Sequence, residues 1–168
     1  MKTSFPSVTS NTQINEISRM ASEIWREAYS ATHSQEQIEY MLNLFLSPGS
    51  ISEQIDKEGF MYCFVEYNGT TAGFFGVCPR KEGNTLLLSK LYLFKEFRGK
   101  GLFEASMEEI RQITIREKLP AIRLHVNKQN TRAINAYKKY GFTVVEIKAF
   151  DIGHGYFMDD YVMEYALK

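Results

Sequence analysis

The sequence predicts a single α+β domain, spanning residues 1–168, built on a mixed and mostly antiparallel sheet. The length is that of one domain and is large enough to bury about 70% of the surface of the unfolded chain. Helical patterns fill the first third of the chain, and strand-like runs separated by turn signals such as Asn68-Gly69 follow. The 10 Tyr and 12 Phe residues suit a chain with several strands.

Composition excludes some classes of function. Lys+Arg and Asp+Glu both number 20, so the formal net charge is +0, whereas a nucleic-acid-binding domain is normally basic. No apolar run approaches 18 residues, and no cleavable apolar segment follows Met1. We therefore expect a cytoplasmic protein with no nucleic-acid or membrane partner and with reduced thiols at Cys63 and Cys78, both read as small buried hydrophobes.

The N-terminal elements follow from Pro6 and from apolar spacing. Residues 2–9 form a short edge strand at best, because Pro6 marks the segment as peripheral. Asn11 or Thr12 can then cap a helix. The apolar face expected for that helix consists of Ile14, Ile17, Ala21, Ile24, Trp25 and Ala28.

Two further helices are expected before the sheet. Thr32 or Ser34 starts the second, which Ser47-Pro48-Gly49 stops, and Ser50 starts a short third helix through Lys57. The apolar residues of the second helix are Ile38, Met41, Leu42 and Phe45.

The remaining chain alternates strands with two helices. Asn68-Gly69 is a type I′ hairpin signal, Lys81-Glu82-Gly83-Asn84 is the next turn, and Gly141 ends the last helix. The expected strands are residues 60–67, 71–78, 86–94, 121–127, 143–150 and 157–167, and the expected helices are residues 102–118 and 131–140.

A strand, a glycine loop and a helix follow one another between Leu86 and Ile110. Two glycines, Gly99 and Gly101, let the backbone approach a bulky phosphate, and the N–H groups at a helix start favour negative charge. Lys95, Arg98 and Lys100 add positive charge to this segment. The pattern predicts a phosphate site.

The kind of phosphate ligand follows from the glycine spacing. A P-loop needs Ser or Thr directly after its lysine, and Gly101 stands there; a dinucleotide fingerprint needs a third glycine. The loop Arg98-Gly99-Lys100-Gly101-Leu102-Phe103 instead resembles the Arg/Gln-x-x-Gly-x-Gly/Ala loop of the GCN5-related N-acetyltransferases (GNAT). In that family the loop binds the pyrophosphate of acetyl-CoA.

A second segment is similar to the same family. Asn130, Ala133, Tyr137 and Gly141-Phe142 match its Asn-x-x-Ala-x-x-x-Tyr-x-x-x-Gly-Phe pattern. The resemblance implies a GNAT fold with helices on both faces of the sheet and a splay between two parallel central strands, where acetyl-CoA pairs with strand backbone. The implied cofactor-binding residues are Leu91, Tyr92, Leu93, Arg98, Gly99, Lys100, Gly101, Leu102, Phe103, Glu104, Asn130 and Tyr137.

Phe103 departs from the family pattern, which has Gly or Ala at this position. The ring either leans back into the core beside Met107 or obstructs the cofactor. The first case, which we favour, predicts an active enzyme. The second favours a module that binds acyl-CoA or a partner without catalysis.

Two residues are candidates for catalysis. The resemblance assigns Tyr137 to the departing CoA thiolate, and a plain core position is the alternative. His125, on the strand before Asn130, could accept the amine's proton at neutral pH, but it could equally be a solvent-facing strand residue, with water as the base. His33, His125 and His154 are too scattered to suggest a metal site.

The acceptor site is expected, by resemblance, between the first two helices and the last hairpin. Trp25 and Tyr29 share a helix face, Tyr40 follows, and the hairpin carries His154 and Asp159-Asp160. Aromatic walls with nearby carboxylates suit a small cationic amine, although Trp25 and Tyr29 could be core and Asp159-Asp160 a solvated turn edge. The leading hypothesis is an N-acetyltransferase for a small amine; a polypeptide amine and a non-catalytic protein remain alternatives, and a homodimer is possible.

Overall fold

The computed structural model describes residues 2–168, and the chain divides into two compact units. The first comprises the chain up to Cys78 together with Lys90–Glu109, and the second comprises Pro79–Ser89 with Ile110–Lys168. The hydrogen-bonded strand order is β1-β2-β3-β4-β5-β7-β6, and β4 (Thr85–Leu93) contributes residues to both units. The expected α+β class with a mixed, mostly antiparallel sheet is confirmed.

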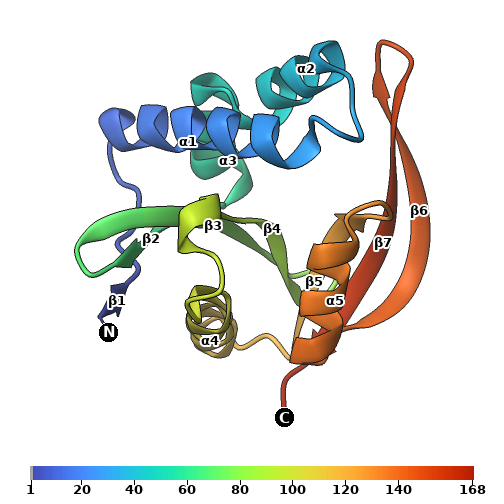
Figure 1. Ribbon diagram of the computed structural model, residues 1–168. Helices are drawn as coiled ribbons and strands as arrows, with labels where there is room; N and C mark the ends of the chain where they lie inside the picture. Colours follow the sequence, from blue (N-terminus) through green and yellow to red (C-terminus); the bar gives the residue numbers. More distant parts are fainter. Residues whose placement is uncertain (1) are drawn as a thin grey trace. The chain divides into compact units, whose positions relative to one another are not determined.

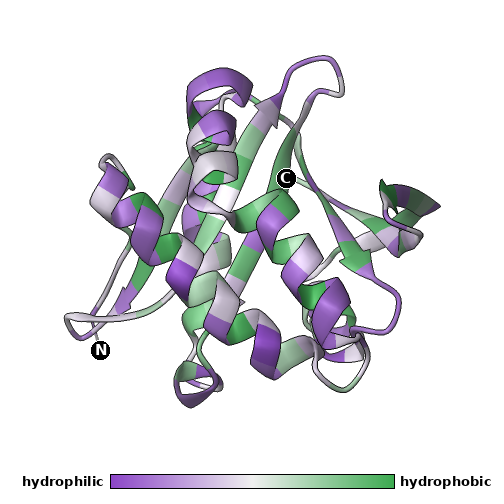
Figure 2. Cartoon of the chain, turned by 90° about the horizontal axis from the view of Figure 1, so that it is seen from above, coloured by the Kyte–Doolittle hydropathy of each residue, from purple (hydrophilic) through white to green (hydrophobic). Residues whose placement is uncertain are grey.

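The first unit holds the three N-terminal helices and the first strands (Figure 1). Its elements begin with β1 (Thr3–Ser4), α1 (Asn11–Tyr29), α2 (Gln35–Leu46), α3 (Pro48–Glu58), β2 (Met61–Tyr67) and β3 (Thr70–Arg80). The short 3₁₀ helix η1 (Lys95–Phe97) and the start of α4 (Leu102–Arg116) complete it. The helices alternate polar and apolar residues along their length (Figure 2), as amphipathic helices do.

The start of α1 is one residue earlier than expected. Ser10, rather than Asn11 or Thr12, is the N-cap: its hydroxyl accepts from the Gln13 backbone N–H, and the Gln13 side chain accepts from the Ser10 N–H. This reciprocal capping box satisfies two N–H groups at once. Ala28 is exposed and does not belong to the apolar face, whereas Met20 does.

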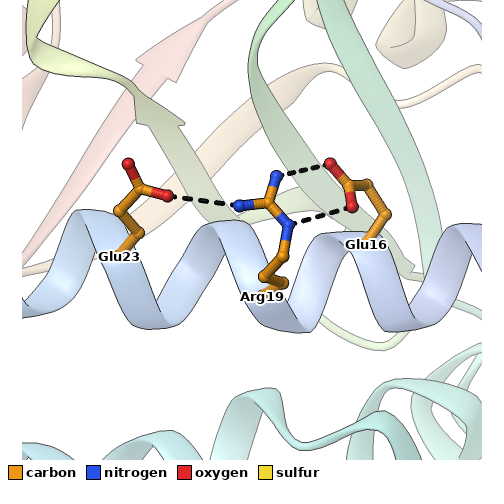
Figure 3. Close-up of polar contacts among 3 residues, drawn as sticks. All are labelled: Glu16, Arg19 and Glu23. Atoms are coloured by element: carbon orange, nitrogen blue, oxygen red, sulfur yellow. Dashed lines mark hydrogen bonds and ion pairs between the residues drawn. The ribbon is translucent and has the colours of Figure 1, made fainter.

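The outer face of α1 carries a charged triad (Figure 3). Arg19 forms ion pairs with Glu16 at 2.6 Å and with Glu23 at 3.2 Å, one turn away on either side. Pairs at this spacing stabilise a solvent-exposed helix by a few tenths of a kcal/mol each, roughly 0.2–0.5. The triad is a helix-stabilising feature of a solvated surface.

The third helix begins before the residue expected to cap it. Ser47, not Ser50, caps α3 by accepting from the Ser50 N–H, and Pro48 occupies the first helical turn. Proline suits that turn because its missing N–H would have no helical acceptor there. The same Ser47-Pro48-Gly49 segment therefore ends α2 and starts α3.

The β2–β3 hairpin turns at Asn68 and Gly69, which have φ angles of 50° and 81°. Positive φ at both central residues confirms the expected type I′ turn. Further along β3, a Cβ at Gly73 would stand 2.1 Å from the Tyr92 carbonyl of β4. The absence of a side chain at Gly73 therefore permits the close approach of β3 to the end of β4.

The second unit is a sheet region with parallel and antiparallel pairs. Its β4 segment pairs in parallel with β5 (Ala121–Asn127), through Leu86–Leu88 and Ile122–Leu124. The long hairpin of β6 (Thr143–Gly153) and β7 (Tyr156–Ala166) pairs with β5 through β7 (Figure 1). The helix α5 (Thr131–Tyr140) ends at Gly141, as expected.

The hairpin turn is shorter than the expected six-residue turn, Asp151 to Tyr156. Only His154 and Gly155 lie between the two strands, both with positive φ. Asp159 and Asp160 are therefore strand residues on β7 and do not form a turn edge.

Candidate active site

The glycine loop before α4 is an open backbone cradle. Gly99 and Gly101 have φ angles of 75° and 77°, and no atom lies within 4 Å of the place a Cβ would take at either. The Gly101 carbonyl accepts from the Ala105 N–H, so the helix starts at Leu102. A helix start with space in front of it fits a pyrophosphate, because first-turn N–H groups point at such a ligand.

Arg98 holds this loop in place. Its Nε–H donates to the Leu93 carbonyl at 3.2 Å, and its guanidinium pairs with Glu27 of α1 at 3.0 Å. The side chain thus ties the loop to the end of β4 and to α1. Lys100 and Glu104 are both exposed beside the cradle.

The last three residues of β4, Leu91, Tyr92 and Leu93, are all half-buried. Tyr92 packs against Trp25 and Phe74, with ring centroids 5.9 and 5.8 Å apart. Phe103, one residue into α4, is also half-buried.

In the second unit, Asn130 and Tyr137 both belong to α5, one as its N-cap and the other as a buried residue of the helix. Asn130 Oδ1 accepts from the Ala133 N–H at 3.2 Å and so caps α5. Tyr137 lies two turns later with 9% of its surface exposed, and its ring meets Phe142 edge-on at 5.4 Å. Residues of the motif therefore stabilise α5 itself: Asn130 caps its start, and Phe142, just after its end, packs against Tyr137.

His125 lies on β5 with its ring 5.4 Å from the ring of Phe150 on β6. Although the residue is exposed, packing round the ring removes part of its water, and this lowers the pKa of His125. Lys148 and Arg123 lower the pKa further, while Glu146 opposes them. A neutral imidazole, the form that can accept a proton, is therefore favoured at pH 7.

The aromatic residues expected at the acceptor site contact one another within the first unit. Trp25 meets Tyr29 edge-on at 5.1 Å, and Tyr29 meets His33 at 5.3 Å. Trp25 is only 5% exposed, and its indole Nε1 has no hydrogen-bond partner. Tyr40 is half-buried. His33, which lies in the bend between α1 and α2, is an addition to this cluster that no local sequence pattern indicates.

The hairpin residues have unlike environments. His154 is exposed at the turn, and Asp159 is exposed and pairs with Lys128 at 3.0 Å. Asp160 is 1% exposed, and its Oδ1 has no hydrogen-bond partner. The expectation of a solvated edge is therefore wrong for Asp160. Alternation along β7 could have indicated that these two neighbours face opposite sides of the sheet.

Comparison with known proteins decides the family. The model of the Acetyltransferase (GNAT) family matches residues 15–142. The chain belongs to the GNAT acetyltransferase family. Acetyl-CoA is its co-substrate, and the open cradle of Gly99 and Gly101 fits the pyrophosphate of that molecule.

Solved structures share the fold of this GNAT acetyltransferase. A PaiA N-acetyltransferase from Thermoplasma acidophilum, in complex with coenzyme A, is 22% identical with a TM-score of 0.81, and the match covers 99% of this chain and 100% of that one. A GCN5-related N-acetyltransferase from Rhodopseudomonas palustris is 11% identical with a TM-score of 0.81, over 99% and 97%. The ribosomal-protein-S18-alanine N-acetyltransferase from Escherichia coli is 16% identical with a TM-score of 0.69, over 98% and 94%. No curated protein matches the chain.

Residues 2–168 contain neither a metal-ligand cluster nor a helix suited to cross a membrane. No group of three or more His, Cys, Asp or Glu in this part of the chain could hold a metal ion. No helix within the same residues is long and apolar enough to cross a membrane.

Proposed function

We propose that this GNAT acetyltransferase transfers the acetyl group of acetyl-CoA to the primary amine of a small cationic molecule in the cytoplasm. The observation that carries the proposal is the open glycine cradle at the start of α4, tied by Arg98 to the end of β4. The cradle supports binding of the pyrophosphate, and the backbone of Leu91, Tyr92 and Leu93 is available by position for the pantetheine arm.

The reaction is direct attack in a ternary complex. The amine nitrogen attacks the thioester carbonyl carbon, and collapse of the tetrahedral intermediate breaks the C–S bond and releases the CoA thiolate. A phenol of pKa about 10 gives its proton only uphill to a thiolate of about 8.5. Tyr137 therefore stabilises the thiolate through a short charge-assisted hydrogen bond.

The proton lost by the amine goes to His125, directly or through water. The lowered pKa of this imidazole keeps it neutral at pH 7, so it has a lone pair for the proton. Its place beside Phe150 fixes the ring on one face of the sheet. No metal enters this scheme.

The acceptor is recognised, in this proposal, by Trp25, Tyr29, Tyr40, His154 and Asp159. The edge-on contact of Trp25 with Tyr29 supports an aromatic wall for a cation. A homodimer is the partner proposed for the intact protein, and exposed Ile147 on β6 offers a surface on which to test it.

The test is release of free thiol from acetyl-CoA in the presence of a panel of amines. We expect release that depends on both the enzyme and a small primary amine. Calorimetric titration with acetyl-CoA and desulpho-CoA runs in parallel. Binding without release from any amine would support the non-catalytic alternative, and no binding of either ligand would overturn the proposal.

A further inference from the structure

The carboxyl group of Asp160 is the unexplained polar group of the last hairpin. Asp160 is 1% exposed, and its Oδ1 accepts no hydrogen bond from any group in residues 2–168. A buried carboxylate oxygen without a donor is costly, and such groups in folded proteins normally have a partner. An oxygen in this state is a ready acceptor for a donor that a ligand brings.

Two lysines, one in register with Asp160 and one paired with its neighbour Asp159, have other contacts. Lys148 stands opposite Asp160 in the β6–β7 register, but its ammonium lies 5.1 Å over the ring of Phe150. Lys128 pairs with Asp159 and lies 5.7 Å over the ring of Tyr161. The ion pair of Lys128 is thus with Asp159, whereas the Asp160 side chain faces the other side of the sheet.

Asp160 lies on the same face of the sheet as His125, the proposed base. Asn127 of β5 is its direct cross-strand partner, and His125 lies two residues earlier on the same face of β5. Diagonal neighbours of this kind have Cα atoms about 7–8 Å apart. A short linear molecule with two amino groups could therefore place one beside Asp160 and the other beside His125.

We propose that Asp160 binds the second, non-reacting ammonium group of a small linear diamine acceptor. This inference rests on the proposed function, and it names the substrate class of the same site. The ammonium donates to Oδ1 and neutralises the buried charge, and the interaction is strong because little water competes with it. Asp160 then determines the preference for an acceptor with a second ammonium group.

The proposal has a signature in pH. Burial first, and then the neighbouring Asp159, raise the pKa of Asp160 to about 6. The other charged or titratable groups around it are Lys148, Lys128 and His125. As pH falls below about 6 the carboxyl of the free enzyme becomes neutral, so KM for a diamine should rise, whereas KM for a monoamine should show no such step.

The experiment compares putrescine, a linear diamine, with butylamine, which has the same carbon chain and one amino group. We expect kcat/KM of the wild type to favour putrescine at least tenfold. Asp160→Asn keeps the shape of the side chain but removes its charge, so the preference should fall below about threefold, mainly through KM. The control Asp56→Asn, which removes the charge of an exposed aspartate on α3, should keep the wild-type preference, and acetyl-CoA affinity should be the same in all three proteins.

A second measurement does not depend on the folding of a variant. The side-chain carboxyl carbon of Asp160 is titrated by NMR in the wild type, with and without putrescine, and its pKa should fall when the diamine is bound. An unchanged pKa, a preference that persists in Asp160→Asn, or no preference in the wild type would overturn the inference. In each case, thiol release with any small amine would leave the proposed function standing, and its absence with every amine would remove both.

Discussion

At the scale of single residues, the environment of each side chain limits the chemistry it can do. Tyr137 is 9% exposed on α5, a helix that Asn130 caps, so the phenol is held in one place. His125 lies on a strand against Phe150, with a lowered pKa. The environment of Tyr137 suits stabilisation of an anion, and that of His125 suits acceptance of a proton.

Tyr137→Phe should lower kcat tenfold or more. The substitution removes the hydroxyl that stabilises the thiolate, but it keeps the ring that packs against Phe142. Affinity for acetyl-CoA, measured by calorimetry, should be nearly unchanged. A fully active phenylalanine variant would show that Tyr137 is only a packing residue.

His125→Ala should change the pH dependence of the rate. In the wild type, kcat/KM should rise with pH through the lowered pKa of His125, because only the neutral imidazole accepts a proton. The alanine variant should lack this rise of kcat/KM with pH, and it should be slower than the wild type at pH values above the pKa of His125. Identical pH–rate profiles for the two proteins would assign the proton to water instead.

At the scale of elements, the glycine loop and β4 differ in how far they are exposed to solvent. The loop before α4 keeps its backbone open, with two glycines at positive φ. By contrast, β4 buries Lys90, whose ammonium donates to Gln54 at 2.7 Å and lies 4.7 Å over the ring of Phe60. The glycine loop is open to a ligand, whereas β4 holds a buried charge that costs free energy of folding.

Gly101→Ala should weaken acetyl-CoA binding tenfold or more. An alanine at φ 77° is strained by roughly 1–2 kcal/mol, and its methyl group would occupy the open cradle. Gly69→Ala is the matched control, since Gly69 has φ 81° and equally open surroundings in the β2–β3 turn. It should lose similar stability and keep its calorimetric affinity; equal affinity losses in both variants would contradict a phosphate cradle at Gly101.

Lys90→Met should increase the free energy of unfolding at pH 7 by about 1–3 kcal/mol, because it removes a buried charge from an apolar site. Burial lowers the pKa of Lys90 to about 8, although Glu58 and Cys78 act in the opposite direction. The unfolded state, with a lysine pKa of about 10.4, therefore binds more protons between about pH 8 and 10.4. Stability due to this group consequently rises with pH across that window.

Denaturant unfolding at pH 7 and at about pH 9.5 measures this effect. The gap between Lys90→Met and the wild type should shrink at the higher pH. Lys57→Met, which removes an exposed lysine of α3 paired with Glu53, should show no such change. A Lys90→Met protein less stable than the wild type at both pH values would mean that the contacts with Gln54 and Phe60 outweigh the cost of burial.

At the scale of the whole molecule, ligand binding and folding are linked. Acetyl-CoA binds the native chain and has no site in the unfolded one, so it stabilises the fold by mass action. The cradle that carries the proposal depends on α1, through Glu27, as well as on the loop itself. Binding should therefore be visible in global unfolding.

A saturating concentration of acetyl-CoA should raise Tm. At a hundred times Kd the stabilisation is about 2.7 kcal/mol, which for a chain of this size corresponds to a shift of roughly 5–11 °C. Differential scanning calorimetry over a concentration series checks the expected logarithmic dependence. The Gly101→Ala protein should need a higher concentration for the same shift, and a shift of equal size with free adenine would contradict recognition of the pyrophosphate.

Much of the fold and part of the site could be predicted from local signals. Gly99 and Gly101, the Asn68-Gly69 turn and the cap at Asn130 act within a few residues, through φ angles and single hydrogen bonds, so the sequence alone indicates them. Strand alternation indicates that Asp159 and Asp160 face opposite sides of the sheet, but only the tertiary structure decides which of them is buried. The two neighbours are residues of the same type. The pairing of β7 with two other strands decides which one is exposed and which one is buried. The same holds for Lys90, since a lysine is normally expected to be exposed to solvent. Its burial depends on residues far away in the chain, such as Gln54, and no local sequence pattern indicates that contact.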